Sequence, residues 1–251
     1  MPTEVRGPER IQKIIRAAGI ASRRAAEDLI LQGRVTRNGE TVELGARAVS
    51  GVDEIAVDGI PVETGVKLRY FALNKPAGVL STAAEEPGSR RTVLDMLDPS
   101  LTAEYRLFPV GRLDMDSTGL ILLTNDGFLA NRLLHPRYEV PREYVVDVEP
   151  IPSQGDLSRL RKGVRLEEGD TGPAKVSLAD KRRGGGRVRM TLHTGRNRQI
   201  RRSFEMLGYR VVGLNRVRFG SLGLGNLRPG QYRELSPREV SELYRRTGWT
   251  E

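Results

Sequence analysis

The amino-acid sequence predicts an α+β fold, in which a small N-terminal helix-helix-hairpin domain precedes a larger domain with a largely antiparallel or mixed sheet flanked by helices. Short apolar runs bounded by turn residues outnumber segments with helical periodicity, and such runs are typical of strands. The helices do not alternate regularly with strands, as a parallel α/β fold would require. With 251 residues, the chain is long enough for one sizeable core and a small second domain.

The N-terminal domain is predicted at residues 9–62, after a polar tail at residues 1–8. Isoleucines recur at helical spacing within residues 9–18, and Gly19 follows as a helix-terminating residue. Ser22 can cap a second helix. Two tight hairpin turns are predicted after these helices, at Asn38-Gly39 and Asp58-Gly59.

The larger domain is predicted at residues 68–251, after a short linker at residues 63–67. Strands are expected at residues 69–74, 107–110, 120–123, 144–148 and 188–192. Helices are expected at residues 92–97, 128–135, 156–162 and 197–207, with Asn197 capping the last of these, and after the capping box Ser236-Pro237-Arg238-Glu239. Residues 83–91 are interrupted by Gly and Pro and predict a surface loop.

The composition excludes several kinds of site. The chain has no cysteine, which removes disulfides, thiolate nucleophiles and cysteine-ligated zinc. Its two histidines, His135 and His193, are too few for a three-histidine metal site and are expected to be structural hydrogen-bonding groups. The phosphate-loop and dinucleotide-binding glycine motifs are absent. Any enzyme is therefore expected to use carboxylate, hydroxyl, phenol and guanidinium groups, without a cofactor or a metal.

The charge of the chain points to a polyanionic partner. The formal net charge is +9, and residues 180–218 alone contain twelve Lys and Arg against two acidic residues. A solvated basic face is the simpler explanation, but this concentration favours a nucleic-acid groove. No segment has the apolar length of a membrane span, and the charged N-terminus shows no signal peptide. We therefore expect a cytoplasmic protein that does not bind a membrane.

The stretch GRLDMDSTGLILLTNDG, residues 111–127, is the strongest candidate for a site of chemistry. Buried apolar runs precede and follow its first part, which places Arg112, Asp114 and Asp116 on a tight loop between two strands. Spacing alone leaves a second interpretation open, in which Asp114 caps a turn and Arg112 is its surface partner. A hydrolase that uses both aspartates as a pair is disfavoured, because neighbours two residues apart poorly flank a glycosidic bond.

Two sets of motifs resemble known families. The stretches GIASRR and QGRVTRNG, within residues 9–62, resemble the small RNA-binding module of ribosomal protein S-four. The motifs NKPAG, GRLDMDSTGLILLTNDG, REY and GRNRQIRRSFEMLG, within residues 68–251, resemble the bacterial ribosomal RNA pseudouridine synthases that carry such a module, and they are more similar to the large-subunit branch. The resemblance implies isomerisation of one uridine in ribosomal RNA, most simply the large-subunit 23S RNA, by a monomer without a cofactor. A small-subunit 16S substrate and a non-catalytic ribosome-assembly factor are the alternatives.

The resemblance also assigns roles to single residues. It implies that Asp114 is the nucleophile, that attack falls on the sugar C1′ or on C6 of uracil, and that Arg201 pairs with Asp114. Tyr144 is expected to stack on the base and to serve in proton transfer, and Asp116 is expected to lie outside the catalytic role. Arg112 is expected to occupy the space that the flipped uridine leaves. The expected RNA contacts are Arg10, Lys13, Arg23, Arg24, Arg34, Arg37, Lys75, Arg112, Arg196, Arg198 and Arg202, of which Lys75 is expected to contact either a phosphate or the floor of the pocket.

Overall fold

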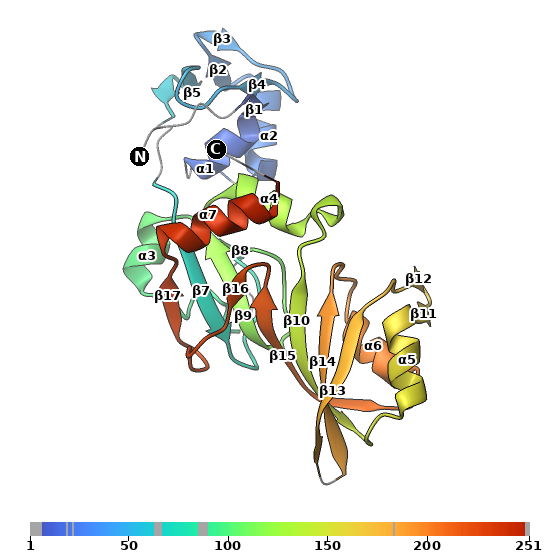
Figure 1. Cartoon of the computed structure of the whole chain (residues 1–251). Helices are drawn as coiled ribbons and strands as arrows, with labels where there is room; N and C mark the ends of the chain where they lie inside the picture. Colours follow the sequence, from blue (N-terminus) through green and yellow to red (C-terminus); the bar gives the residue numbers. More distant parts are fainter. Residues whose placement is uncertain are drawn as a thin grey trace. The chain divides into compact units, whose positions relative to one another are not determined.

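The computed structural model describes residues 7–18, 20–21, 23–62, 67–84, 90–182 and 184–248. The predicted terminator Gly19, the predicted cap Ser22, most of the polar tail and linker, and residues 85–89 of the predicted surface loop lie outside these residues. The chain divides into two compact units (Figure 1). The smaller contains residues 1–69 with 103–106 and 125–127, and the larger contains the rest.

The smaller unit packs two helices and short hairpins around its own core. Its helices are α1 (Ile11–Ala17) and α2 (Arg23–Leu31). Its strands are β1 (Glu9–Arg10), β2 (Val35–Arg37), β3 (Glu40–Thr41), β4 (Arg47–Ala48), β5 (Ile55–Val57) and β6 (Ile60–Pro61), in which β1 pairs with β4 and the others form a sheet of order β3-β2-β5-β6. Both predicted hairpins are confirmed, because each turn has positive φ at its two central residues: 52° and 86° at Asn38-Gly39, and 52° and 77° at Asp58-Gly59.

A nine-stranded mixed sheet forms the larger unit, so the predicted α+β class is confirmed. The strands are β7 (Tyr70–Lys75), β8 (Phe108–Pro109), β9 (Thr118–Thr124), β10 (Arg142–Glu149), β13 (Lys175–Arg182), β14 (Gly185–Leu192), β15 (Arg210–Phe219), β16 (Leu222–Gly223) and β17 (Tyr232–Glu234). The main path runs β13-β14-β10-β15-β9-β7-β17, and β11 (Arg165–Leu166) pairs separately with β12 (Gly169–Asp170). Only the pairing of β9 with β15 is parallel among these described strands.

Helices cover the sheet in two places. The helices are α3 (Pro99–Glu104), α4 (Gly127–Leu134), the 3-10 turn η1 (Pro136–Tyr138), α5 (Gln154–Lys162), α6 (Gln199–Glu205) and α7 (Pro237–Arg246). Leucines of α5 and Phe204 of α6 form one core with the inner face of β10, and α4 and α7 form a second core with β7 and β9 (Figure 1). In the described part of the chain, no helix is both long and apolar enough to cross a membrane.

Two predictions about elements are wrong, and two long strands were not predicted. Residues 92–97 form a turn in which the Asp95 carboxylate accepts from the amide of Thr92 at 2.7 Å, and a helix begins only at Pro99. Asn197 does not cap α6, because the N-cap is Arg198 in a left-handed conformation with φ 46°. Strands β13 and β15 were not predicted, since their charged residues obscure the alternation of buried and exposed positions. The capping box that starts α7 is confirmed at Ser236 and Glu239.

Candidate active site

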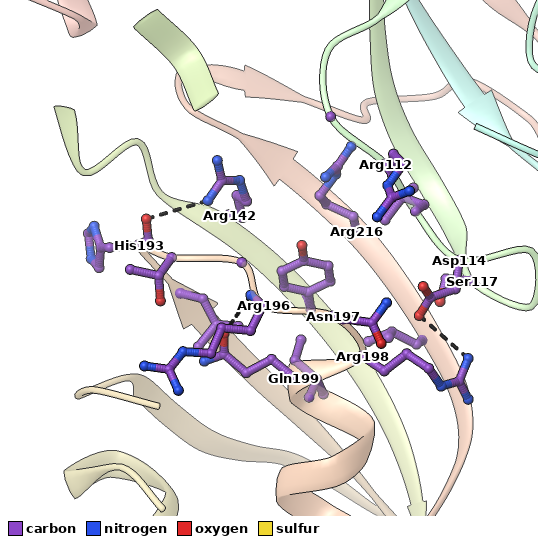
Figure 2. A pocket seen from close by; sticks show the side chains of 18 of the residues that line it. Arg112, Asp114, Ser117, Arg142, His193, Arg196, Asn197, Arg198, Gln199 and Arg216 are labelled. Carbon is purple, nitrogen blue, oxygen red and sulfur yellow. Dashed lines mark hydrogen bonds and ion pairs between the residues drawn. The ribbon is translucent and has the colours of Figure 1, made fainter. Parts of the chain in front are cut away.

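A pocket of about 470 Å³ lies in the larger unit, at the end of the inner face of β10. This volume is within the usual range for a small-molecule site. Figure 2 shows Arg112, Arg142 and Arg216 toward one side of the pocket and Asp114 close to Arg198 on another. Tyr144, His193 and Arg196 also line the pocket. The fold therefore brings predicted residues from three separate segments, the loop after β8, the start of β10 and the segment before α6, into one cavity.

The loop of residues 111–119, between β8 and β9, is fixed at both ends by glycines with positive φ. The φ angles are 78° at Gly111 and 104° at Gly119. A Cβ on Gly119 would lie 2.3 Å from the carbonyl oxygen of Arg216 and 2.7 Å from its amide nitrogen. Only glycine therefore permits the parallel approach of β15 to β9, and this approach holds the end of the loop in place.

Lys75 supports this loop from within the protein, and its burial does not agree with the expected phosphate contact. Its side chain is 0% exposed, and its Nζ donates to the carbonyl oxygens of Ser117 at 2.7 Å, Pro76 at 3.0 Å and Met115 at 3.3 Å. Burial lowers the pKa of Lys75 to about 8, although the carboxylates of Asp116 and Asp114 oppose that change. The ammonium group holds the backbone of the loop and does not face solvent.

The aspartates of the loop face two arginines from the start of α6. Arg198 Nη1 lies 3.6 Å from Asp114 Oδ2 and 3.5 Å from Asp116 Oδ1. Arg201 Nη2 lies 3.2 Å from Asp116 Oδ2 and also donates to the Asp116 carbonyl at 3.3 Å. The predicted pairing of Arg201 with Asp114 is therefore wrong in this structure. The left-handed backbone at Arg198 directs that arginine to Asp114 instead, and Arg201 follows three residues later on the helix.

Tyr144 lies on β10 directly opposite Arg216 of β15 and Met190 of β14. It is 9% exposed and lines the pocket. Arg142 and Arg216 line the same pocket and are 8% and 2% exposed. These two arginines were not among the predicted site residues. The spacing of Arg142 two residues before Tyr144 was an available signal, since both side chains then share a face of the strand.

The other predicted RNA contacts are of two kinds: exposed arginines, and arginines that are paired with a carboxylate. Arg112 is exposed, and the exposed side chain of Arg196 donates to the backbone carbonyls of Glu168 and Gly169, at 3.0 and 2.8 Å. Arg202, by contrast, donates two hydrogen bonds of 2.5 Å to the Glu168 carboxylate, and these bonds lower the pKa of Glu168 to about 2. Arg202 is therefore committed to a carboxylate and is a poorer candidate for a phosphate contact.

The same division appears in the smaller unit. Arg34 forms two hydrogen bonds with Asp58, at 2.7 and 2.5 Å, and Arg37 donates to the Arg47 carbonyl at 2.7 Å. The remaining predicted contacts there are exposed: Arg10, Lys13, Arg23 and Arg24. The structure thus leaves a subset of the predicted basic residues accessible to a phosphate backbone.

The basic surplus of residues 180–218 is partly neutralised by acidic residues from β10. Arg187 pairs with Asp147 at 2.7 Å, Arg189 with Glu143 at 3.0 Å, and Arg210 with Glu149 at 2.5 Å. The count along the chain therefore overstated the positive charge of this region. Neither histidine is in a metal site: His135 Nδ1 accepts from the Arg137 amide, and His193 Nδ1 lies 2.8 Å from the Glu139 carbonyl. Among the described residues, no cluster of three His, Asp or Glu forms a candidate metal site.

The chain is similar to known proteins in both sequence and fold. Residues 69–206 match the family model for RNA pseudouridylate synthase, and residues 9–55 match the S4 domain. The chain is 47% identical to ribosomal large subunit pseudouridine synthase B of Bacillus subtilis, over 94% of this chain and 95% of that protein. It is 41% identical to the protein of the same name from Pseudomonas aeruginosa, over 96% of this chain and 63% of that protein. A crystal structure of a pseudouridylate synthase superimposes with a TM-score of 0.67 at 32% identity, over 93% of this chain and 99% of that one.

Proposed function

The chain belongs to the RNA pseudouridylate synthase family, and from this premise we propose that it converts one uridine of large-subunit ribosomal RNA to pseudouridine with Asp114 as the nucleophile. The observation that carries the assignment of Asp114 is its position in the pocket, beside an arginine and on a loop held by Lys75. The large-subunit substrate is supported by two relatives whose names state it.

The proposed reaction needs no change of oxidation state. The C1′–N1 glycosidic bond of uridine breaks, the base turns, and a C1′–C5 bond forms while C5 loses a proton and N1 gains one. A carboxylate that bonds covalently to the sugar C1′ or to C6 of the base divides this reaction into easier steps. Asp114 is released as a carboxylate when the new carbon–carbon bond has formed. The overall balance is that of an isomerisation, so no cofactor is proposed.

The surrounding residues support this role in different ways. Arg198 positions the carboxylate of Asp114, because its guanidinium lies 3.6 Å from that carboxylate. Arg201 acts on the chemical step through the loop, since it holds both the carboxylate and the carbonyl of Asp116. Tyr144 supplies the surface on which the base stacks and a phenol that can transfer a proton. Arg112 occupies the space that the flipped uridine leaves in the RNA.

The S4 domain is proposed to hold the RNA through its exposed Arg10, Lys13, Arg23 and Arg24. We also propose that the enzyme is a monomer and that it acts in the cytoplasm, where ribosomal RNA is present.

Pseudouridine maps of ribosomal RNA from a deletion strain and its parent test the proposal. One pseudouridine of the large-subunit RNA should disappear on deletion and return with the wild-type gene, but not with a gene encoding Asp114→Asn. Loss of a small-subunit site would move the substrate to the other ribosomal RNA. An unchanged map would remove ribosomal RNA as the substrate, and restoration by Asp114→Asn would remove this aspartate from the central role.

A further inference from the structure

Two buried arginines in the pocket, Arg142 and Arg216, have no carboxylate partner in the described part of the chain. Arg142 donates to the backbone carbonyls of His193 at 3.4 Å and Leu133 at 3.3 Å. Arg216 donates through Nε to the Leu120 carbonyl at 2.7 Å, and its buried Nη2 has no hydrogen-bond partner among the described residues. Each guanidinium has five donors, so most of this capacity is unused. A buried charge without a counter-ion is costly, which indicates that a ligand with hydrogen-bond acceptors that carry or develop negative charge completes the site.

A β-bulge brings the two arginines together. Tyr144 pairs with Arg216, but the preceding Glu143 pairs with Arg218, so Val217 is an extra residue in β15. In a regular strand, residues 216 and 219 would lie on opposite faces, because three positions separate them. With the bulge, the guanidinium carbons of Arg142 and Arg216 lie 5.5 and 5.1 Å from the centre of the Phe219 ring. Bulges commonly redirect side chains in this way beside active sites.

We infer that Arg142 and Arg216 bind the carbonyl oxygens of the target uracil and stabilise the negative charge that develops there, an inference that rests on the proposed isomerisation of uridine in this pocket. If Asp114 attacks C1′, the electron pair of the breaking C1′–N1 bond passes to the base and reaches O2. If Asp114 adds to C6, the electron pair of the C5–C6 double bond reaches O4. Both routes therefore place charge on oxygens that a guanidinium can bind.

The depth of the arginines favours the base over the RNA backbone as their ligand. A flipped nucleotide enters a pocket with its base first, and its phosphates remain near the rim. Arg112 and Arg196 are exposed, whereas Arg142 and Arg216 are 8% and 2% exposed. The exposed arginines are thus suited to phosphates, and the buried pair is suited to the base.

The test uses an RNA hairpin that contains the mapped target uridine, made with either uridine or 5-fluorouridine at that position. The electron-withdrawing fluorine stabilises negative charge on the base, so the reaction depends less on the arginines. Arg216→Gln should lower the single-turnover rate at saturation by about 10² on uridine RNA, as loss of an oxyanion donor does. The same substitution should also lower the rate on 5-fluorouridine RNA, measured as consumption of that nucleoside, but by a factor that is about tenfold smaller. Arg216→Lys should recover part of the rate because it keeps the charge.

Arg210→Gln is the matched control, because Arg210 lies on the same strand but forms an exposed ion pair with Glu149. It should leave both rates unchanged. Both RNAs are tested with one protein preparation, so the ratio of the two rates does not depend on the folded fraction. Arg142→Gln, on the neighbouring strand, provides the same ratio if Arg216→Gln does not fold.

If Arg216→Gln lowers the rate by the same factor on the two RNAs, the role of Arg216 is structural and the inference is overturned. An unchanged rate at saturation, with a salt slope of binding smaller by about 0.7, would identify a phosphate contact and would also overturn it. If the wild-type enzyme leaves the uridine RNA unchanged, the proposed substrate fails, whatever the variants show.

Discussion

The charged side chains on the two faces of strand β10 differ in whether they have partners of opposite charge. On the outer face, the acidic side chains pair with arginines of the neighbouring strands β14 and β15, as in Arg187–Asp147, Arg189–Glu143 and Arg210–Glu149. On the inner face, Arg142 and its neighbour Arg216 are buried without a carboxylate in the described structure. The outer face is complete without a ligand, whereas the inner face is not. This difference separates charge that stabilises the sheet from charge that is available to a substrate.

The largest effect should come from the nucleophile on the pocket side. Asp114→Asn should fold and bind RNA but lower the single-turnover rate by at least about 10³, because an amide is a far weaker nucleophile than a carboxylate. Asp116→Asn is the matched control on the same loop and should retain measurable turnover. Substantial pseudouridine formation by Asp114→Asn would remove the distinction between the two aspartates.

Lys75 tests whether buried charge beneath the pocket supports the loop. Lys75→Met should be less stable than the wild type at pH 7, because three carbonyl oxygens lose their donor. The pKa of Lys75 falls from 10.5 when unfolded to about 8 when folded, so between these values the unfolded chain binds more protons. Wild-type stability should therefore rise with pH across this window.

Lys75→Met lacks this pH-dependent contribution. The difference between its free energy of unfolding and that of the wild type should therefore grow by about 3 kcal/mol between pH 8 and 10.5, at about 1.4 kcal/mol per pKa unit. Urea unfolding of both proteins across this pH range measures the difference. A difference in stability that is constant with pH would show that the pKa of Lys75 is not lowered in the folded protein.

The sequence predicted those parts of the molecule whose structure is determined by residues close together in the chain. The hairpins at Asn38-Gly39 and Asp58-Gly59 follow from residues that tolerate positive φ, and the start of α7 follows from a capping box. Motif resemblance located Asp114 and Tyr144, which the structure brings into one pocket. None of these depended on knowing which strands are neighbours.

The errors arise where the partner is distant in the chain. Arg202 was expected to contact a phosphate because its ion-pair partner Glu168 is far away in the sequence. The burial of Lys75 was not predicted because two of its carbonyl acceptors, Met115 and Ser117, lie far along the chain. Strand β15 was missed because a buried arginine, Arg216, stands where an apolar residue would mark the alternation. Charge counted along the chain likewise could not show which arginines meet the carboxylates of β10.

The salt dependence of RNA binding should distinguish Arg196, whose side chain donates to backbone carbonyls, from Arg202, which is paired with a carboxylate, although the effect is smaller than those above. Arg196→Gln should reduce the slope of log affinity against log salt by about 0.7, the value for one phosphate of single-stranded RNA. Arg202→Gln should change the slope less, because Arg202 is already bound to Glu168. Equal changes in the two slopes would show that the ion pair opens when RNA binds.

The smallest effect should come from the outer face of β10. Arg187→Gln removes a two-bond pair with Asp147, at 2.7 and 2.9 Å, whose side chains are 35% and 30% exposed. Such partly solvated pairs contribute roughly 1 kcal/mol or less, so the free energy of unfolding should fall only by about that amount. The single-turnover rate at saturation should remain that of the wild type, since the side chain lies on the face opposite Tyr144. Denaturant unfolding and the rate are measured on the same preparation. A rate loss comparable to that of Arg216→Gln would mean that the two faces are coupled through the strand, and the division between structural and substrate-facing charge would fail.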